Sequence, residues 1–176
     1  MINSKRKGFS LIELLIVVAI ILIISAIAVP NIMRGKIAAN QASAASSLRT
    51  LNTAAVNYSS TFQDGYPPNL GVLGPSGTVN ATCNTAGLID AILATGQKSG
   101  YQFSWTTGAE QVAAAPAGCA APGYADMFSV TASPFGFPSG TTYYCVDATG
   151  VIRESYTPIA ATTAGCPLSA IPIGGD

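Results

Sequence analysis

The fold of this chain is decided by the stretch FSLIELLIVVAIILIISAIAV, residues 9–29. Only Ser10, Glu13 and Ser25 interrupt its run of apolar residues. At a rise of about 1.5 Å per residue, a helix of this length would span about 30 Å, the thickness of the hydrocarbon core of a bilayer. A backbone in lipid must satisfy its own hydrogen bonds, so the stretch predicts a helix that crosses a membrane or is covered by other apolar surfaces.

Three interpretations of this stretch compete. The tripeptide Ala26–Ala28 is a small-x-small site, as at the end of a cleaved signal peptide, but the stretch is longer than a usual signal core. A plain membrane anchor explains the length and leaves Glu13 unexplained, because a lone carboxylate in hydrocarbon costs about a few kcal/mol unless it has a partner. The third interpretation is a cut after Gly8. It would free the amine of Phe9 to pair with Glu13, in the same chain or in a neighbouring copy.

The string KGFSLIELLIVV, residues 7–18, closely resembles the prepilin signature of type IV pilins and type II secretion pseudopilins. The resemblance implies cleavage after Gly8 by a prepilin peptidase and N-methylation of Phe9, the new first residue. It also implies that Glu13 acts in filament assembly, towards the N-terminus of a neighbouring subunit. The resemblance extends over about residues 5–32.

A second helical segment follows Pro30. Proline removes one helix hydrogen bond, so we expect the helix to kink or loosen there, at the position of the family's helix-kinking proline. Beyond it, apolar residues recur mostly three or four apart, with Gln41 as the one gap, and predict an amphipathic continuation to Phe62. This stripe consists of Ile37, Ala44, Leu48, Leu51, Ala55, Tyr58 and Phe62, and the polar residues expected opposite it are Asn40, Ser47, Arg49, Asn52 and Asn57. We expect one helix from Phe9 to Phe62, an apolar rod that continues as the spine of a globular head.

The remainder of the chain predicts a small head of helix and sheet. Residues 63–80 carry turn chemistry and predict a loop, and Thr85–Thr95 predicts a short helix. Alternation and aromatic content predict antiparallel strands at Tyr101–Trp105, Met127–Thr131, Thr142–Val146 and Val151–Ser155. Asp147–Gly150 joins the last two as a hairpin turn, which we prefer to a calcium site because few carboxylates cluster nearby. The fold class is α+β, a long N-terminal helix packed on a small antiparallel sheet, and the resemblance to pilins implies the same order of elements.

Four cysteines lie downstream of the apolar stretch. An even number on the exported side of a membrane predicts two disulfides, and the sequence allows three pairings. We favour Cys83–Cys119 and Cys145–Cys166, since each pairing closes a local loop. The last 20 residues are rich in Pro, Gly and Ala, and we expect a loop that is pinned by Cys166.

The composition argues against an enzyme and against a protein that binds nucleic acid. The sequence has no histidine, which excludes serine-protease-type triads and histidine metal sites, and its acidic residues are scattered. Basic and acidic residues are equal in number, eight of each, so no basic surface points to DNA or RNA. We therefore expect no catalytic site, no metal and no cofactor.

These observations predict four segments. Residues 1–8 are a leader peptide that is cleaved off, 9–30 a transmembrane or filament-core helix, 31–62 an amphipathic helix and 63–176 the globular head. The expected function is structural, a subunit of a homo-oligomeric type IV pilus for adhesion, motility or related surface functions. The expected partners are the prepilin peptidase, the assembly machinery and the bacterial inner membrane, before the chain enters an extracellular filament. Two alternatives stay open, a pseudopilin of a type II secretion system and a minor pilin with a binding head.

Overall fold

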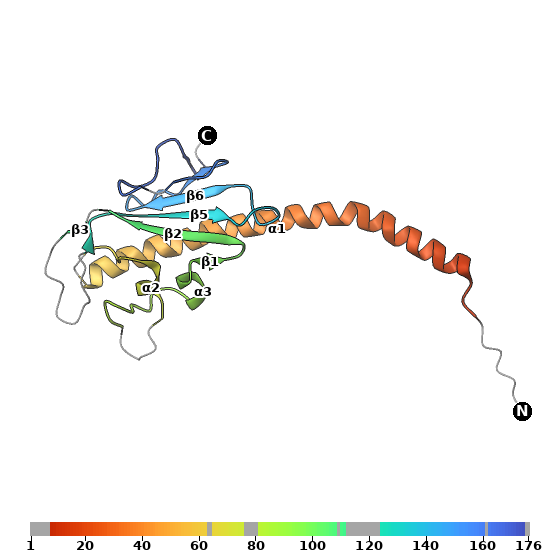
Figure 1. The fold of residues 1–176 in the computed structure, drawn as a ribbon, viewed down its shortest axis with the longest axis horizontal. Helices are drawn as coiled ribbons and strands as arrows, with labels where there is room; N and C mark the ends of the chain where they lie inside the picture. Colours follow the sequence, from red (N-terminus) through yellow and green to blue (C-terminus); the bar gives the residue numbers. More distant parts are fainter. Residues whose placement is uncertain are drawn as a thin grey trace, which may run out of the picture. The chain divides into compact units, whose positions relative to one another are not determined.

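The chain consists of two compact units that share one helix. The computed structural model describes residues 8–62, 65–75, 81–108, 110–111, 124–160 and 162–174. The first unit ends at Lys36, and the second runs from Ile37 to Asp176. The shared element is α1 (Leu11–Phe62), and all strands belong to the second unit, which we call the head (Figure 1).

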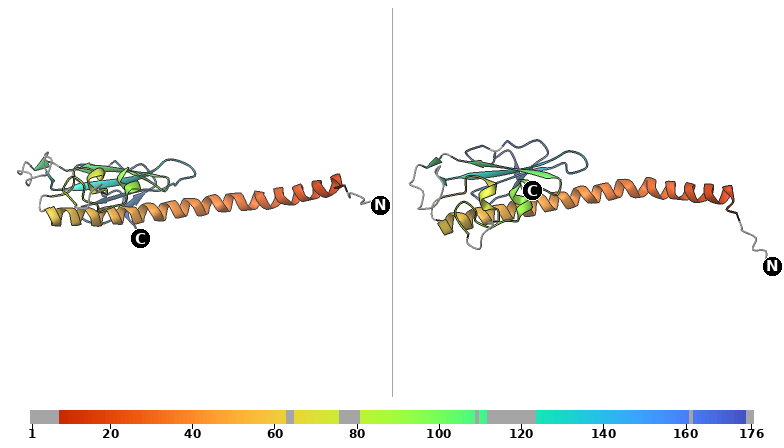
Figure 2. Two further views of the ribbon diagram at one scale, coloured as in Figure 1. Left: turned by 90° about the horizontal axis from the view of Figure 1, so that it is seen from below. Right: turned by 60° about the horizontal axis from the view of Figure 1, so that its bottom comes forward.

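The helix α1 has 52 residues and runs without interruption through Pro30 (Figure 2). We expected the helix to begin at Phe9, two residues earlier than it does. The difference arises because Ser10 lies outside the helix as its N-terminal cap and its carbonyl accepts the first helical hydrogen bond, from Leu14 N at 3.3 Å. The predicted single helix is otherwise confirmed to its last residue, Phe62.

The head is built on a six-stranded antiparallel sheet with the strand order β1-β2-β5-β6-β7-β8. Its strands are β1 (Gln97–Lys98), β2 (Tyr101–Thr107), β5 (Phe128–Pro134), β6 (Tyr143–Asp147), β7 (Arg153–Ser155) and β8 (Ile171–Pro172). A second pair of strands, β3 (Glu110–Gln111) and β4 (Tyr124–Ala125), forms its own small sheet. The long helix and the antiparallel sheet confirm the predicted α+β fold class.

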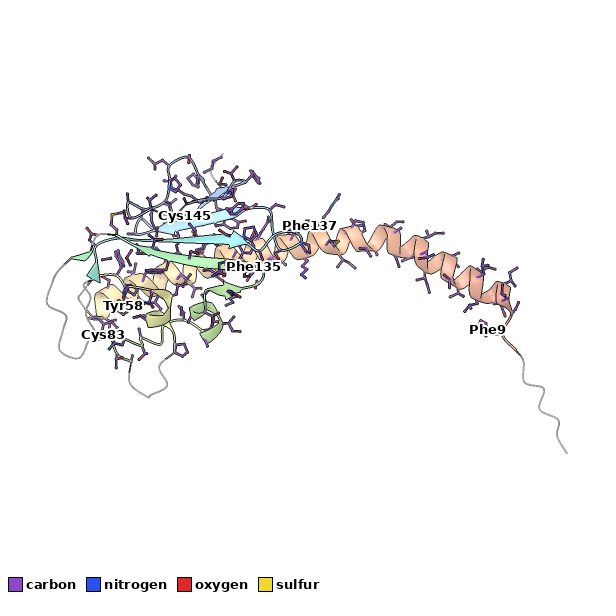
Figure 3. All side chains as sticks on the ribbon, in the orientation of Figure 1. Phe9, Tyr58, Cys83, Phe135, Phe137 and Cys145 are labelled. Carbon is purple, nitrogen blue, oxygen red and sulfur yellow. A yellow bond between two sulfur atoms is a disulfide. The ribbon has the colours of Figure 1, made fainter. Side chains whose placement is uncertain are left out.

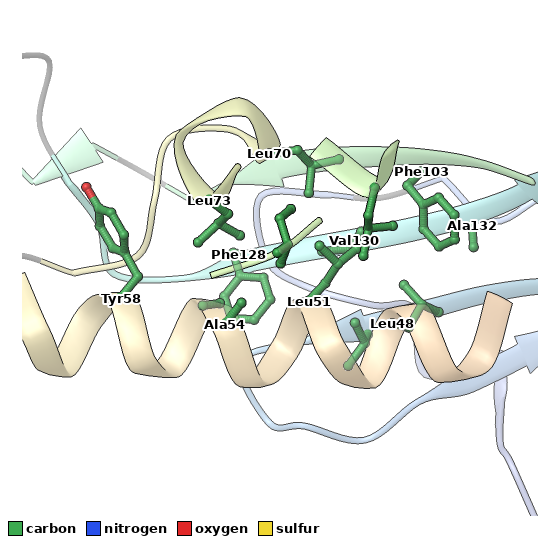
Figure 4. Packing of buried hydrophobic residues seen from close by; sticks show 14 of the residues in the cluster. Leu48, Leu51, Ala54, Tyr58, Leu70, Leu73, Phe103, Phe128, Val130 and Ala132 are labelled. Carbon is green, nitrogen blue, oxygen red and sulfur yellow. The ribbon is translucent and has the colours of Figure 1, made fainter. Parts of the chain in front are cut away.

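The core of the head lies between α1 and the sheet. Leu48, Leu51 and Tyr58 of α1 are almost completely buried, in one cluster with Phe128 and Val130 of β5 (Figure 4). Burial of each such side chain contributes about 1.5–3 kcal/mol relative to leaving it in water. The predicted apolar stripe of α1 is therefore the surface that holds the head together.

The polar side of α1 differs from the prediction. Ser47 is buried, while Asn40 and Asn52 are half-buried and donate to backbone carbonyls of the head. Asn40 Nδ2 lies 2.9 Å from Ser139 O, and Asn52 Nδ2 lies 3.1 Å from Asp147 O. The expectation that these residues lie opposite the packed face is wrong, because the head covers more of the helix than the apolar stripe alone.

The helix predicted at Thr85–Thr95 is mostly wrong. Only α3 (Ala91–Ala94) forms, capped by Asp90, whose side chain accepts from Leu93 N at 2.9 Å. Upstream, the N–H groups of residues 86–89 donate to carbonyls of residues 72–74 instead of forming helical bonds. A non-local backbone pairing has therefore replaced the local helix.

The segment predicted as a loop over residues 63–80 contains one helical turn, α2 (Leu70–Leu73). Asn69 caps this turn, because its side chain accepts a hydrogen bond from Val72 N at 3.2 Å. Leu70 and Leu73 are buried in the same core cluster as α1. The loop thus contributes apolar residues to the core, which its turn-rich composition did not indicate.

The four predicted strands correspond to β2, β5, β6 and β7, with ends that differ by up to three residues. The predicted hairpin turn is confirmed, since β6 and β7 pair as neighbours on either side of Asp147–Gly150. The C-terminal segment is not only a loop, because Ile171 pairs with Glu154 and adds β8 to the edge of the sheet.

Candidate assembly site

The start of α1 is the candidate assembly site, and Glu13 is its one acidic side chain. Gly8, Phe9 and Ser10 are exposed and lie before the helix. The backbone N–H of Ser10 donates to Glu13 Oε2 at 3.1 Å. A cap residue followed three positions later by a glutamate that reaches back to the cap is a capping-box arrangement. The Glu13 carboxylate is therefore held at the first turn, where the helix dipole also favours a negative charge.

Ser10 is a site residue that we did not single out in the sequence, where it counted only as a polar interruption. The signal was present, since Ser-x-x-Glu directly before an apolar run marks a helix N-terminus. The hydrogen bond from Ser10 N to Glu13 also bears on the predicted charge pair between Glu13 and the amine of Phe9. The nitrogen of Phe9 precedes the nitrogen of Ser10 by one residue, so a cut after Gly8 would create an amine beside the group that Glu13 already binds.

The apolar surface of α1 in the first unit is exposed in the part of the chain that the structure describes. Among the described residues, α1 is a helix with the length and composition to cross a bilayer, and its most apolar window is entirely unburied. Phe9 and Leu11 are each 80% exposed. An apolar surface of this size needs lipid or protein to cover it.

Pro30 lies inside this surface and leaves Ala26 O without the N–H that another residue would supply. The next residue adds a hydrogen bond beside this carbonyl, because Asn31 Nδ2 donates to Ile27 O at 3.1 Å. This side chain reaches one turn back along the helix and gives a carbonyl next to the defect a donor. Helices that contain proline persist where polar side chains satisfy the backbone groups in this way.

We predict that Asn31→Ala weakens the helix around Pro30 by about 1 kcal/mol, the usual net value of one hydrogen bond. Amide hydrogen exchange of the full chain in detergent would measure the change at residues 26–34. The same substitution in a Pro30→Ala background is the control, because it cancels the difference in helix propensity between Asn and Ala. An equal change in both backgrounds would mean that Asn31 does not compensate for the proline.

At the other end of the chain, the disulfide Cys145–Cys166 joins β6 to the C-terminal segment, with a Cα–Cα distance of 5.9 Å. It is one of the two local pairings that we favoured from the sequence. Cys83 is also disulfide-bonded. Its predicted partner, Cys119, lies outside the described residues, so that pairing stays a prediction.

Asp147 lies beside this disulfide and is buried at the end of β6. Its Oδ1 accepts from Thr149 N at 3.0 Å and from Thr149 Oγ1 at 2.5 Å, and its Oδ2 accepts from Cys166 N at 3.0 Å. Burial acts to raise the pKa of this carboxyl, but the hydrogen bonds from Thr149 and Cys166 outweigh it and lower the pKa below its ordinary 3.8. Both oxygens are used to close the turn and to hold Cys166, which is why we prefer the turn to a calcium ligand.

A shallow hollow of about 410 Å³ lies on the head between α1 and the β6–β7 turn. Arg49, Asn52 and Thr53 line it from the helix, and Val151 and Ile152 line it from the turn. Arg49 is the charged residue among those that line this hollow. The described residues of the lining include no acidic residue and no cysteine. The hollow therefore lacks a pair of groups for acid–base or nucleophilic chemistry.

Residues 3–29 match a family model described as the prokaryotic N-terminal methylation motif. This motif is consistent with the resemblance of residues 7–18 to the prepilin signature. Over 52 residues the chain is 48% identical to the type IV major pilin protein PilA of Myxococcus xanthus (strain DK1622). The aligned stretch covers 30% of this chain and 24% of that protein, so the match spans about a quarter of the relative. No solved structure matches the chain significantly.

Proposed function

We propose that the mature chain is the structural subunit of a type IV pilus and assembles through the first half of α1. The observation that carries this proposal is the uncovered apolar surface of that helix, which lies largely within the methylation motif of residues 3–29 and has a single carboxylate, Glu13, in its first turn. A membrane can cover the helix before assembly, and equivalent helices of other subunits can cover it afterwards. Repetition of one heterologous contact then gives an open helical fibre.

Processing would remove residues 1–8 as a leader. The chain around the proposed cut is exposed, and Gly8 and Phe9 precede α1, so a prepilin peptidase could reach this peptide bond without unwinding the helix. Methylation would then act on the amine of Phe9. The three lysine and arginine residues at positions 5–7 leave with the leader and would keep that end at the cytoplasmic face until then.

The Glu13 pair would contribute to the contact between the helices of the fibre. Lipid tails are as apolar as leucine side chains, so the exchange of lipid for neighbouring helices gives little hydrophobic gain. An unpaired carboxylate in a membrane costs about a few kcal/mol. Pairing Glu13 with the amine of Phe9, first in its own chain and then in a neighbouring subunit, would avoid that penalty, and the pair between subunits would fix the axial register between the helices.

This function places the precursor in the bacterial inner membrane and the mature chain in an extracellular filament. The partners would be copies of the same chain, the prepilin peptidase and the assembly machinery. The head would form the fibre surface, with a structural rather than an enzymatic role. Adhesion and motility are the functions that such a fibre would serve.

Mass spectrometry and electron microscopy of filaments sheared from producing cells would test the proposal. We expect this chain to be the main component, with N-methylated Phe9 as its first residue. A secreted form that begins at Val29 would overturn it, because that form lacks the apolar helix. Fibres that form only with a type II secretion system would instead identify the chain as a pseudopilin.

A further inference from the structure

The loop between β5 and β6 presents two phenylalanines at the surface of the head. Phe135 is 58% exposed and Phe137 is 75% exposed (Figure 3). The sequence from Ser133 to Tyr143 contains no charged residue. Exposed aromatic side chains in a segment without charges are typical of the centre of a protein interface.

The base of this loop is held in place from α1. Asn40 Nδ2 donates to Ser139 O at 2.9 Å, and Gln41 Nε2 lies 3.1 Å from the hydroxyls of both Thr141 and Thr142. Gln41 was the polar gap in the apolar stripe, and these two bonds explain it. The loop is therefore fixed to the first residues of the helix within the head, which begins at Ile37.

Strand β2 holds the loop from the other side. Phe135 N donates to Gly100 O at 3.0 Å, and the hydroxyl of Tyr101 donates to Thr142 O at 2.9 Å. Gly140 packs so closely on the ring of Tyr101 that a Cβ atom at this position would clash with it. The phenylalanines thus project from a supported base, and their binding to a partner would require little further ordering of the loop.

We propose that Phe135 and Phe137 form a contact between subunits and pack on the apolar first half of α1 of a second copy. This inference rests on the proposed function. In a fibre of roughly parallel helices, neighbouring subunits would be displaced along the axis. The apolar half of α1 of one subunit would then lie next to the start of the head of another. The loop is bonded to α1 at that place, through Asn40 and Gln41.

A neighbouring helix is a better partner for this loop than a membrane surface. Peripheral membrane contacts usually combine apolar residues with Lys or Arg, and residues 133–143 contain neither. The apolar half of α1 is likewise uncharged from Leu14 to Met33, so the two surfaces match in character. Copies of the chain are also the most abundant apolar partners in a growing fibre.

Photo-crosslinking in assembled fibres would test the contact. The photoreactive analogue p-benzoylphenylalanine at position 137 keeps an aromatic ring there, and fibres grown from mixed ¹⁴N and ¹⁵N subunits separate links between chains from links within one. After reduction and tryptic digestion, we expect the peptide 99–153 of one chain to be joined to the peptide 9–34 of another. Links confined to lipid, to the same chain or to a neighbouring head would overturn the proposal.

Substitution gives a second, independent measurement. We expect the double variant Phe135→Ser and Phe137→Ser to lower the yield of sheared fibres about tenfold or more, as the loss of buried aromatic anchors does. Tyr156→Ser and Leu168→Ser are matched controls, since these side chains are 80% and 86% exposed and lie elsewhere on the head. An undiminished yield in the loop variant would refute the contact.

The loop double variant and the control variants should retain the wild-type amount of processed chain in the membrane. A normal amount would exclude misfolding as the cause of a low fibre yield. A failure of the proposed function itself is recognised differently, because the wild-type chain would then form no fibres. Normal wild-type fibres together with normal fibres of the loop variant would contradict only the contact.

Discussion

Glu13→Ala is expected to prevent filament assembly while cleavage after Gly8 continues. The variant would leave the amine of Phe9 without its partner inside a fibre, and truncation of one member of a buried charge pair costs about 3–5 kcal/mol. At one such contact per subunit, this corresponds to a loss of about a hundredfold or more in the affinity of each addition. Mass spectrometry of the membrane-bound chain would report processing, and the yield of sheared fibres would report assembly.

The sharper variant is Glu13→Gln, because the structure gives Glu13 a second role. An amide oxygen can still accept the hydrogen bond from Ser10 N, so the glutamine keeps the helix cap but loses the charge. If the charge drives assembly, Glu13→Gln should fail as completely as Glu13→Ala. If fibres of Glu13→Gln form in normal yield, the capping bond is the role of Glu13 and the pairing with an amine is wrong.

The two roles also suggest an order of events. While the leader is attached, the nitrogen of Phe9 is an uncharged amide, and the hydrogen bond from Ser10 helps to satisfy Glu13. Cleavage would convert that nitrogen into a cation next to the carboxylate. The precursor would thus carry an incompletely paired carboxylate. Only the processed chain would carry both the carboxylate of Glu13 and the amine of Phe9, and the register between subunits requires both charges.

The elements that could be predicted from the sequence are those with local patterns. The apolar run and the three-to-four spacing predicted the extent of α1 to within two residues, because the first depends on length and composition and the second on the helical period. The strands β2, β5, β6 and β7 were found because their segments are rich in aromatic and β-branched residues, and β6 and β7 also flank a turn with strong local chemistry. Glu13 was found for a chemical reason, as a charge in an apolar stretch.

The elements that were missed depend on distant partners. Residues 86–89 do not continue a helix because their N–H groups meet carbonyls of residues 72–74, and β8 exists because Ile171 pairs with Glu154. No local pattern encodes either pairing. The donor role of Asn31 is local and was missed for a different reason, since a lone asparagine after a proline also fits a turn.

Removal of the disulfide in the C-terminal segment is expected to lower the stability of the head. We predict that the double variant Cys145→Ala and Cys166→Ala loses about 3 kcal/mol of stability in the head, because the disulfide closes a loop with a sequence separation of 21. The loss should appear first in the segment that contains β8, a strand of two residues at the sheet edge. Hydrogen exchange of the full chain in detergent would follow peptides from residues 157–174.

Asp147→Asn is the matched control, because it keeps the disulfide and changes the side chain that accepts hydrogen bonds from Cys166 N and from Thr149. Loss of a charge-assisted hydrogen bond costs about 1.5–3 kcal/mol, so this variant should open the segment less than removal of the disulfide does. The depressed pKa of Asp147 gives it a further signature. The stabilisation by its carboxylate is present above pH 3.8 and is lost as the pH falls through its lower folded-state pKa, and the asparagine variant lacks this dependence. If protection of β8 is the same with and without the disulfide, Asp147 and the strand pairing alone hold the segment, and the cross-link does not stabilise this edge of the head.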